Sequence, residues 1–295
     1  MRLVVVASPS FSALNLLREA GIDFVATTDP TLLRDADIIV IAPRYGSLLR
    51  GLIAPHLRWI HALGAGVETL PFDELRKSDV IVTNSRGVYA DALAEFAIAA
   101  MLWFAKDLRR LMRNQDAKLW EPYTVERVEG KSVGIIGYGG IGRAVGRRAE
   151  ALGMRILAVS RHSGDIDDTL TADYIVLSTP LTPSTRGMID AWRIARMKST
   201  AVLINISRGA IVDEAALVDA LREKRIRGAA LDVFETEPLP PTHPLWTLDN
   251  VLISPHTADH AADSHERAMR FFLRNHEHFR RSEALENVVD KDREY

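Results

Sequence analysis

Three polar side chains each follow a short apolar run of the kind that forms a buried strand. Arg208 comes after Ala-Val-Leu-Ile-Asn-Ile-Ser, Glu237 after Ala-Leu-Asp-Val-Phe-Glu-Thr, and His256 after Val-Leu-Ile-Ser-Pro. Ligands bind where the strands of an open parallel sheet end, so these side chains can converge on one crevice. A fixed cation, a carboxylate and a titratable imidazole suit the binding of a carboxylate-bearing molecule and proton transfer at its neighbouring carbon.

Each of these residues also has an ordinary structural explanation. A histidine behind Pro255 can be a hydrogen-bonded loop residue, and an arginine before a glycine often closes a strand. His243 and His260 lie near the same segments, but these two do not have the spacing of paired metal ligands, and no metal site is predicted. The prediction of a catalytic site therefore depends on the three side chains lying close together in the fold.

A glycine-rich segment lies upstream of this set. Gly137-Tyr-Gly139-Gly-Ile-Gly142 follows the apolar run Val-Gly-Ile-Ile and precedes a plausible helix at 143–152. In a dinucleotide site the first glycine permits a tight turn, the second lets the backbone approach the pyrophosphate, and the third allows close helix–strand packing. The alternative is a glycine-rich turn without a ligand, but the strand before it and the helix after it favour a dinucleotide site.

The end of the next strand bears on the choice of coenzyme. An acidic side chain there would bind the ribose 2′-hydroxyl of NAD, but Ser160 and Arg161 offer no carboxylate. The planar guanidinium of Arg161 suits a 2′-phosphate, which favours NADP(H). Asp165 lies close enough to keep NAD(H) possible, and Arg161 can also be a solvated surface residue. With the polar set downstream, this site indicates hydride transfer to or from a 2-keto or 2-hydroxy acid.

Length, composition and charge exclude several classes of protein and of site. The 295 residues suffice for two ordinary domains, and a formal net charge of −2 gives no sign of a nucleic-acid or anionic-membrane partner. No apolar run approaches the roughly 20 residues that a membrane helix needs. The absence of cysteine excludes a disulfide, a thiolate nucleophile and a zinc–sulfur site. We expect a cytoplasmic protein.

The alternation of strands and helices predicts an α/β protein with parallel sheets. Short β-rich runs alternate with helical stretches over the first ninety or so residues, and a second such series begins at residue 132. A long apolar helix from about residue 91 to 112 joins the two series and should be buried on two sides. It suits a hinge or a subunit interface, or is simply a central core helix.

These segments together resemble the D-isomer-specific 2-hydroxyacid dehydrogenase family, most of all its glyoxylate/hydroxypyruvate reductases. The resemblance rests on five segments in the right order, namely 133–143, 179–187, 204–213, 231–240 and 254–258. In addition, Leu63-Gly-Ala-Gly-Val67 resembles the family's substrate-carboxylate loop. The resemblance implies two Rossmann- or flavodoxin-like parallel-sheet domains with the active site in a cleft between them.

The same resemblance implies a division of the chain and an activity. A discontinuous substrate domain would comprise residues 1–92 and 264–295, and a dinucleotide-binding domain would comprise residues 93–263. The activity would be hydride transfer between nicotinamide C4 and C2 of a small 2-keto or D-2-hydroxy acid, such as glyoxylate or hydroxypyruvate. The sequence does not indicate which acid is used.

Roles for the three polar residues follow from the resemblance as well. Arg208 would bind the substrate carboxylate and polarise its C2 carbonyl, and His256 would be the acid in reduction and the base in oxidation. Glu237 would hold the imidazole ring and stabilise its charged form. Glu235 competes for that role, but Glu237 fits the family pattern directly before Pro238.

Binding contacts are implied in the same way. Asp232 would hydrogen-bond the nicotinamide amide, and the backbone amides of Ala65 and Gly66 would bind the substrate carboxylate. The implied coenzyme contacts are Gly137, Tyr138, Gly139, Gly140, Ile141, Gly142, Ser160, Arg161, Thr179, Pro180, Thr185, Ile206, Ser207, Asp232 and Ala258. The implied substrate contacts are Gly64, Ala65, Gly66, Tyr45, Trp120 and Arg208.

The segment after Arg161 bears on the part of the protein that would surround the coenzyme. Between Arg161 and Tyr174 the chain has only a short polar stretch, where the family usually has another strand and helix near the adenine end of the coenzyme.

Trp120 follows the long helix, and in similar reductases a tryptophan from this region reaches the partner subunit's pocket. We therefore expect a homodimer with Trp120 lining the neighbour's pocket, the alternative being an anchor within its own fold.

Other functions use the same scaffold. A phosphoglycerate-type dehydrogenase needs extra cations for the phosphate, which Arg44 could supply, and formate or phosphite oxidation is a further variant. A non-enzymatic, cofactor-sensing binding protein would need only the coenzyme site, and the complete Arg, Glu and His set argues against it. A methyltransferase with the same glycine turn would leave that set unexplained.

Overall fold

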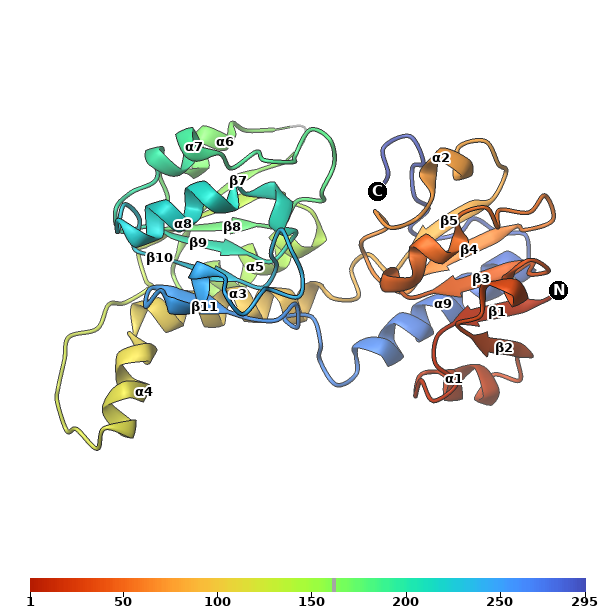
Figure 1. The fold of residues 1–295 in the computed structure, drawn as a ribbon, viewed down its shortest axis with the longest axis horizontal. Coiled ribbons are helices and arrows are strands. Elements are labelled where there is room, and N and C mark those ends of the chain that lie inside the picture. Colours follow the sequence, from red (N-terminus) through yellow and green to blue (C-terminus); the bar gives the residue numbers. More distant parts are fainter. Residues whose placement is uncertain (161–162) are drawn as a thin grey trace. The chain divides into compact units, whose positions relative to one another are not determined.

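Two compact units make up the chain. The structure, a computed structural model, describes residues 1–160 and 163–295. One unit comprises Met1–Tyr89 and Ala261–Tyr295, and the other comprises Ala90–His260. Each contains one parallel β-sheet with helices packed on it (Figure 1), which confirms the predicted α/β fold class. The assignment of substrate and coenzyme binding to these units stays a prediction.

The sheet of the first unit is parallel and has the flavodoxin-like order β2-β1-β3-β4-β5. Its strands are β1 (Leu3–Val6), β2 (Phe24–Thr27), β3 (Ile38–Ile41), β4 (Trp59–Ala62) and β5 (Ile81–Asn84). The connecting elements are α1 (Leu14–Glu19), η1 (Pro30–Leu33), η2 (Pro43–Leu49) and α2 (Phe72–Leu75). The tail helix α9 (Ser264–Arg280) packs beside α1, and Val288 pairs with Thr83 of β5, so the C-terminal segment completes this unit.

The middle strands of this sheet are covered on both faces. All residues of β1, β3 and β4 are buried, which explains why these strands are nearly continuous apolar runs. His61 is the polar exception, with a side chain hydrogen-bonded to Thr83 Oγ1 at 2.8 Å and to Ser85 Oγ at 3.2 Å. Complete burial lowers the pKa of His61 to about 3, so the ring is neutral at physiological pH.

The second unit has a six-stranded parallel sheet in the order β11-β10-β9-β8-β6-β7. Its strands are β6 (Ser132–Ile136), β7 (Arg155–Val159), β8 (Tyr174–Leu177), β9 (Val202–Asn205), β10 (Gly228–Leu231) and β11 (Val251–Ile253). Helices α3 (Ala90–Ala105) and α5 (Gly140–Ala151) pack together on one face, and α7 (Ala191–Arg196) and α8 (Glu214–Arg222) pack together on the other (Figure 1). The short helices η3 (Gly209–Ile211) and η4 (Pro244–Thr247) follow β9 and β10.

The strand order of this sheet reverses beside β6. The chain runs from β6 outward to β7 and then crosses to β8 on the other side of β6. The carboxyl ends of β6 and β8 therefore flank the point where open α/β sheets bind ligands. Within residues 163–173 only the short helix α6 (Ile166–Thr169) precedes β8, so β7 is an edge strand, as the short polar segment predicts.

The expected long helix is two helices. α3 ends at Ala105, and α4 (Leu108–Asp116) begins after Asp107, which has a left-handed φ of 46° and accepts a hydrogen bond from the Arg110 N–H. The prediction of one helix from 91 to 112 was wrong because Asp107 caps a new helix between two segments that both favour helix. Among the residues described, none of the helices combines the length and apolar character needed to cross a membrane.

Burial of His61 predicts a pH dependence of stability. Its folded-state pKa, about 3, lies below the unfolded value of about 6.5, so stability is complete above pH 6.5 and is lost as the pH falls toward 3. Between pH 7.5 and pH 5 the wild-type protein should lose about 2 kcal/mol more unfolding free energy than His61→Gln. Urea titrations at both pH values measure this, with the exposed His56→Gln as control. Equal losses in wild type and His61→Gln would contradict the prediction.

Candidate active site

The three polar residues that the sequence singles out follow neighbouring strands of the second unit. β9, β10 and β11 are adjacent and parallel, so their carboxyl ends lie on one edge of the sheet. Arg208 follows β9, Glu237 follows β10 and His256 follows β11. The adjacency of these strands places the three segments within reach of one another.

His256 and Glu237 are directly hydrogen-bonded. His256 Nδ1 lies 2.7 Å from Glu237 Oε2, and Glu237 Oε1 accepts the Phe234 N–H at 2.9 Å. The two side chains are 42% and 34% exposed, so solvent and small molecules can reach the pair. Glu235, the competing acid, instead donates its backbone N–H to Glu214 Oε2 at 3.1 Å. Of the two candidates, Glu237 is the one that contacts the imidazole.

Each member of this pair changes the protonation of the other. The hydrogen bond to Glu237 raises the pKa of His256 and outweighs burial, which acts in the opposite direction. Burial acts to raise the pKa of Glu237, but the hydrogen bonds from His256 and the Phe234 N–H outweigh it and the pKa is lowered. The charge of Arg208 acts to lower the pKa of both groups. The arrangement therefore favours an imidazolium beside a carboxylate.

A buried aspartate holds the backbone of His256. Asp232 is 2% exposed, and its Oδ1 accepts hydrogen bonds from Ser254 Oγ at 2.5 Å, Thr257 N at 2.9 Å and Ala258 N at 3.0 Å. Its carbonyl oxygen accepts the His256 N–H at 2.8 Å. These bonds stabilise a left-handed φ of 55° at His256, which costs about 1–3 kcal/mol for a residue other than glycine. The predicted nicotinamide contact of Asp232 stays a prediction, and the structure adds this loop-shaping role.

Arg208 is held by contacts with its own loop. Its Nη1 donates to the Ser207 carbonyl at 2.7 Å, and its carbonyl accepts from Asn205 Nδ2 at 3.0 Å. Asn205 is 1% exposed, ends β9, and also accepts the Ser207 N–H at 3.1 Å. Asn205 was not predicted from the sequence to belong to the site. Its position could have indicated it, because it is a polar residue that ends an apolar strand three positions before Arg208, an arginine already predicted to be functional.

The glycine segment forms a tight turn between β6 and α5. Gly137 has a φ of 103°, and a Cβ on it would lie 2.7 Å from Ser178 C and Thr179 N. A Cβ on Gly142 would lie 2.3 Å from the Gly137 carbonyl oxygen. By contrast, a Cβ on Gly139 would meet no atom within 4 Å. The turn is closed toward the sheet and open at the start of α5, which fits a backbone that approaches a phosphate.

Other predicted coenzyme residues lie at the ends of β7 and β8. Ser178 Oγ donates to the Gly137 carbonyl at 2.8 Å, and Thr185 Oγ1 donates to the Pro180 carbonyl at 2.7 Å, which folds back the loop after β8. Ser160 directly follows β7, but Arg161, on which the prediction of NADP(H) depends, lies outside the described residues. The preference for NADP(H) inferred from Arg161 therefore stays a prediction.

The predicted carboxylate loop, residues 63–67, belongs to the first unit. Its carbonyl groups accept hydrogen bonds from the end of β5 and the residues that follow. The donors are Asn84 Nδ2 on Ala65 at 2.7 Å, Ser85 N on Gly64 at 3.0 Å and Tyr89 Oη on Leu63. Bonded carbonyls fix the peptide planes, and this suits a loop whose amides bind a ligand. Tyr45, on η2, packs against the unit's core, with the Arg44 guanidinium 4.7 Å from its ring centroid.

Trp120 lies on an exposed segment of the second unit. We define the arm as α4 and the residues that follow it, 108–127, which extend away from the sheet of this unit (Figure 1). Trp120 is 94% exposed, and none of the α4 residues is buried. The other exposed apolar side chains of the arm are Leu111, Met112, Leu119 and Val125. The structure thus places Trp120 on the surface of its own unit rather than as an anchor within it.

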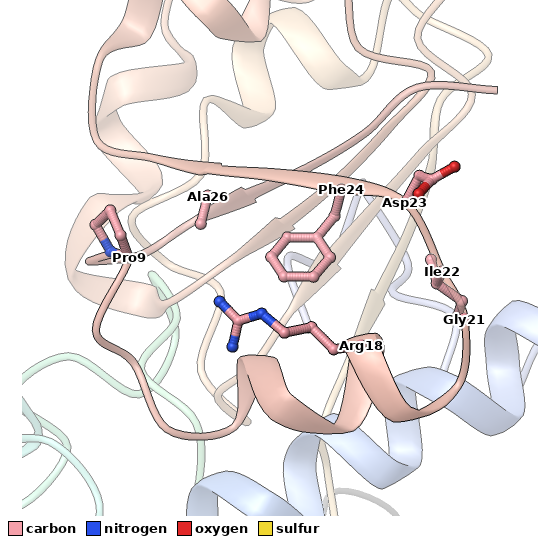
Figure 2. Close-up of a pocket in the computed structure, with 7 residues that line it drawn as sticks. All are labelled: Pro9, Arg18, Gly21, Ile22, Asp23, Phe24 and Ala26. Atoms are coloured by element: carbon pink, nitrogen blue, oxygen red, sulfur yellow. The ribbon is translucent and has the colours of Figure 1, made fainter.

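A surface hollow of the first unit lies apart from these residues. It has a volume of about 490 Å³ and is lined by α1 and β2 (Figure 2). Arg18 extends across it, with its guanidinium 5.5 Å from the Phe24 ring centroid and an Nη1 2.6 Å from Asn15 Oδ1. The residues that line it include none of the predicted site residues. Over the described ranges, no group of three or more His, Asp or Glu side chains could hold a metal ion.

The second unit combines an open parallel sheet, a glycine turn where the strand order reverses, and a His–Glu pair on the same edge. Together these features define a dinucleotide-dependent class of enzyme. The sequence profile described as "D-isomer specific 2-hydroxyacid dehydrogenase, NAD binding domain" matches residues 98–258. The chain therefore belongs to the D-isomer specific 2-hydroxyacid dehydrogenase family and is an NAD(P)-dependent oxidoreductase. This confirms the family predicted from the sequence.

Three known proteins show the extent of the similarity. The glyoxylate reductase of Korarchaeum cryptofilum is 37% identical over 258 residues, which are 81% of this chain and 78% of that protein. The D-3-phosphoglycerate dehydrogenase of Methanocaldococcus jannaschii is 35% identical over 302 residues, 94% of this chain and 57% of that protein. The NADPH-dependent glyoxylate/hydroxypyruvate reductase of Sinorhizobium meliloti has a crystal structure that matches with a TM-score of 0.85 at 26% identity, covering 98% of this chain and 97% of that one.

Replacement of Glu237 by glutamine should lower the pKa of His256. The hydrogen bond to the carboxylate is the largest cause of the raised pKa, and a neutral amide stabilises imidazolium less. NMR titration of labelled histidine measures the shift, with the His256 signal identified from its loss in His256→Gln. Glu235→Gln is the matched control, because Glu235 bonds Glu214 through its backbone N–H, which the substitution keeps. A change in Glu235→Gln but not in Glu237→Gln would reverse the assignment.

Proposed function

We propose that this protein reduces the C2 carbonyl of a small 2-keto acid, such as glyoxylate or hydroxypyruvate, to the D-2-hydroxy acid, with NADPH as the favoured coenzyme. The observation that carries the proposal is the 2.7 Å hydrogen bond between His256 Nδ1 and Glu237 Oε2, in the electrostatic environment of Arg208. The 37% identity to a glyoxylate reductase supports the choice of substrate class.

The polar side chains then have defined roles in the reaction. The bound coenzyme supplies a hydride from nicotinamide C4. Arg208 binds the substrate carboxylate and polarises the C2 carbonyl, where a fixed cation stabilises the negative charge that develops. His256 donates a proton to the carbonyl oxygen from Nε2, because its Nδ1 is bonded to Glu237. In oxidation the same nitrogen accepts the proton. The amides of Ala65 and Gly66 bind the substrate carboxylate as well.

The glycine turn and the neighbouring strand ends would hold the coenzyme. The backbone at Gly139 and the start of α5 would face the pyrophosphate, and Asp232 would bind the nicotinamide amide. Further contacts would come from Tyr138, Gly140, Ile141, Ser160, Thr179, Pro180, Thr185, Ile206, Ser207 and Ala258. The preference for NADPH rests on Arg161, and the Sinorhizobium meliloti relative, whose structure is a complex with NADP, supports it. NAD(H) is the alternative coenzyme.

Phosphoglycerate oxidation is the second candidate function. The similarity to a D-3-phosphoglycerate dehydrogenase extends over 94% of this chain. Arg44 is exposed on η2 and stacked on Tyr45, so it could contribute a cation for a phosphate group. Turnover of 3-phosphoglycerate faster than reduction of the small keto acids would favour this function.

His256→Gln should remove most of the reductase activity and leave NADPH binding intact. Removing the general acid should lower kcat by about 10²–10⁴-fold, because proton transfer to the carbonyl oxygen then has no positioned donor. The measurement is oxidation of NADPH and of NADH by purified wild type and variant with glyoxylate, hydroxypyruvate and phenylpyruvate. Quenching of protein fluorescence by NADPH measures coenzyme binding in the same samples.

The outcomes separate the parts of the proposal. Loss of both turnover and NADPH binding in His256→Gln would indicate a structural role for His256. A strong preference of the wild type for NADH would keep the chemistry and contradict the role of Arg161. NADPH binding without turnover of any of these acids, or of 3-phosphoglycerate, would instead favour a cofactor-sensing protein.

We further infer that the protein acts as a homodimer in which the arm contacts the partner. Leu111, Met112, Leu119 and Trp120 are each more than 40% exposed within one short segment, and a concentration of exposed large apolar side chains indicates an interaction surface. An indole that is 94% exposed in one chain is available to line the substrate pocket of the other. We retain the cytoplasm as the predicted location.

Trp120→Ser should raise the KM for the keto acid about tenfold while the protein stays dimeric. The indole would contribute to the neighbour's pocket, whereas the remaining apolar residues of the arm would maintain the interface. Initial rates at saturating NADPH give KM, and light scattering gives the molar mass. Trp192→Ser is the matched control, since Trp192 is 54% exposed on α7. A wild-type monomer with full activity would rule out the dimer.

A further inference from the structure

A second histidine–carboxylate pair lies in the unit that carries His256. His243 Nε2 is 3.2 Å from Glu214 Oε1, and the two side chains are only 21% and 14% exposed. His243 Nδ1 accepts the Leu245 N–H at 3.4 Å, which caps η4. With Nδ1 an acceptor, the proton of the neutral ring is on Nε2, where it is donated to Glu214. The proposed reaction makes no use of this pair.

Glu214 also bonds the segment that carries Glu237. Its second oxygen, Oε2, accepts the Glu235 N–H at 3.1 Å. Glu214 is the first residue of α8, whose start is fixed by Asp213, because the Asp213 side chain accepts the Ala216 N–H at 3.0 Å. One carboxylate on a fixed helix terminus thus bonds both ends of the segment 235–243.

The start of this segment is also packed against the loop of Arg208. A Cβ on Gly209 would lie 1.9 Å from the Phe234 carbonyl carbon and 2.4 Å from the Glu235 nitrogen, so only glycine permits this approach. At Phe234 the N–H donates to Glu237 Oε1 at 2.9 Å. The backbone that Glu214 and Gly209 fix is therefore the backbone that orients the Glu237 carboxylate.

We propose that Glu214 and His243 are positioning residues, which hold the segment 234–243 so that Glu237 meets His256 Nδ1. The contacts form a continuous series from His243 through Glu214 to the Glu235 amide, and from the adjacent Phe234 amide through Glu237 to the imidazole. This inference rests on the proposed function for its effect on rate, but its effect on the imidazole does not need a substrate. A supporting shell of this kind keeps reacting groups within the narrow range of productive geometry.

The test compares Glu214→Ala and His243→Asn with the wild type. Glu214→Ala removes both acceptors, and His243→Asn keeps an acceptor for the Leu245 amide but is too short to reach Glu214. In both variants the NMR-measured pKa of His256 should fall toward that of Glu237→Gln. The kcat for keto-acid reduction should fall about 10- to 100-fold, with the KM for NADPH unchanged. Glu235→Ala is the matched control, because it keeps the backbone N–H that Glu214 accepts.

A conservative variant and a comparison of the two readouts make the test decisive. Glu214→Gln keeps one acceptor oxygen, so it should give intermediate values, and it replaces Glu214→Ala if circular dichroism shows that the alanine variant is unfolded. Folded variants with the wild-type His256 pKa and the wild-type kcat would overturn the inference. If the wild type reduces none of the acids but the His256 pKa still falls in the Glu214 variants, the positioning role stands and the proposed function fails.

Discussion

The parallel arrangement of strands is the constraint on which the site depends. Every strand of a parallel sheet presents its carboxyl end to the same edge, so segments far apart in sequence lead into one region. In the second unit this edge holds the glycine turn after β6, Arg208 after β9 and His256 after β11. No long loop is needed to bring the functional groups together, because the sheet order already makes β9, β10 and β11 neighbours.

Carboxylates do most of the local shaping on this edge. A buried carboxylate is costly unless hydrogen bonds replace its lost hydration, and here the donors are supplied by the loops that need to be fixed. Asp232 receives three such bonds from the loop after β11, and Glu237 receives one from the Phe234 N–H and one from the imidazole. The same bonds that satisfy these acids also hold His256 in an unusual backbone conformation and raise its pKa.

Strands and the glycine turn could be predicted from the sequence because their signals are local. Apolar runs such as the one around Val202–Asn205 are short, lie between polar segments such as Lys198-Ser-Thr and Ser207-Arg208, and are covered on both faces in the fold. The break at Asp107 was not predictable in the same way, because the residues on both sides favour helix. The anchoring role of Asp232 was also missed, since two of its three donors are backbone amides 25 and 26 positions away, and a backbone donor leaves no residue-type signal. Glu237 could be chosen over Glu235 only by resemblance, because both follow the same strand.

The residues predicted to select the coenzyme and those proposed to transfer the proton follow different strands along the sheet edge. The predicted 2′-phosphate contact belongs to the end of β7, whereas Arg208, Glu237 and His256 follow β9, β10 and β11. β7 is the last strand on its side of the sheet and is partly exposed, and it takes no part in the hydrogen bond of the His256–Glu237 pair. A change in coenzyme preference can therefore occur in this chain without a change in the acid–base chemistry. Strands β6 and β8 lie between these two groups of strand ends, and because all of their residues are buried they form a rigid part of the unit.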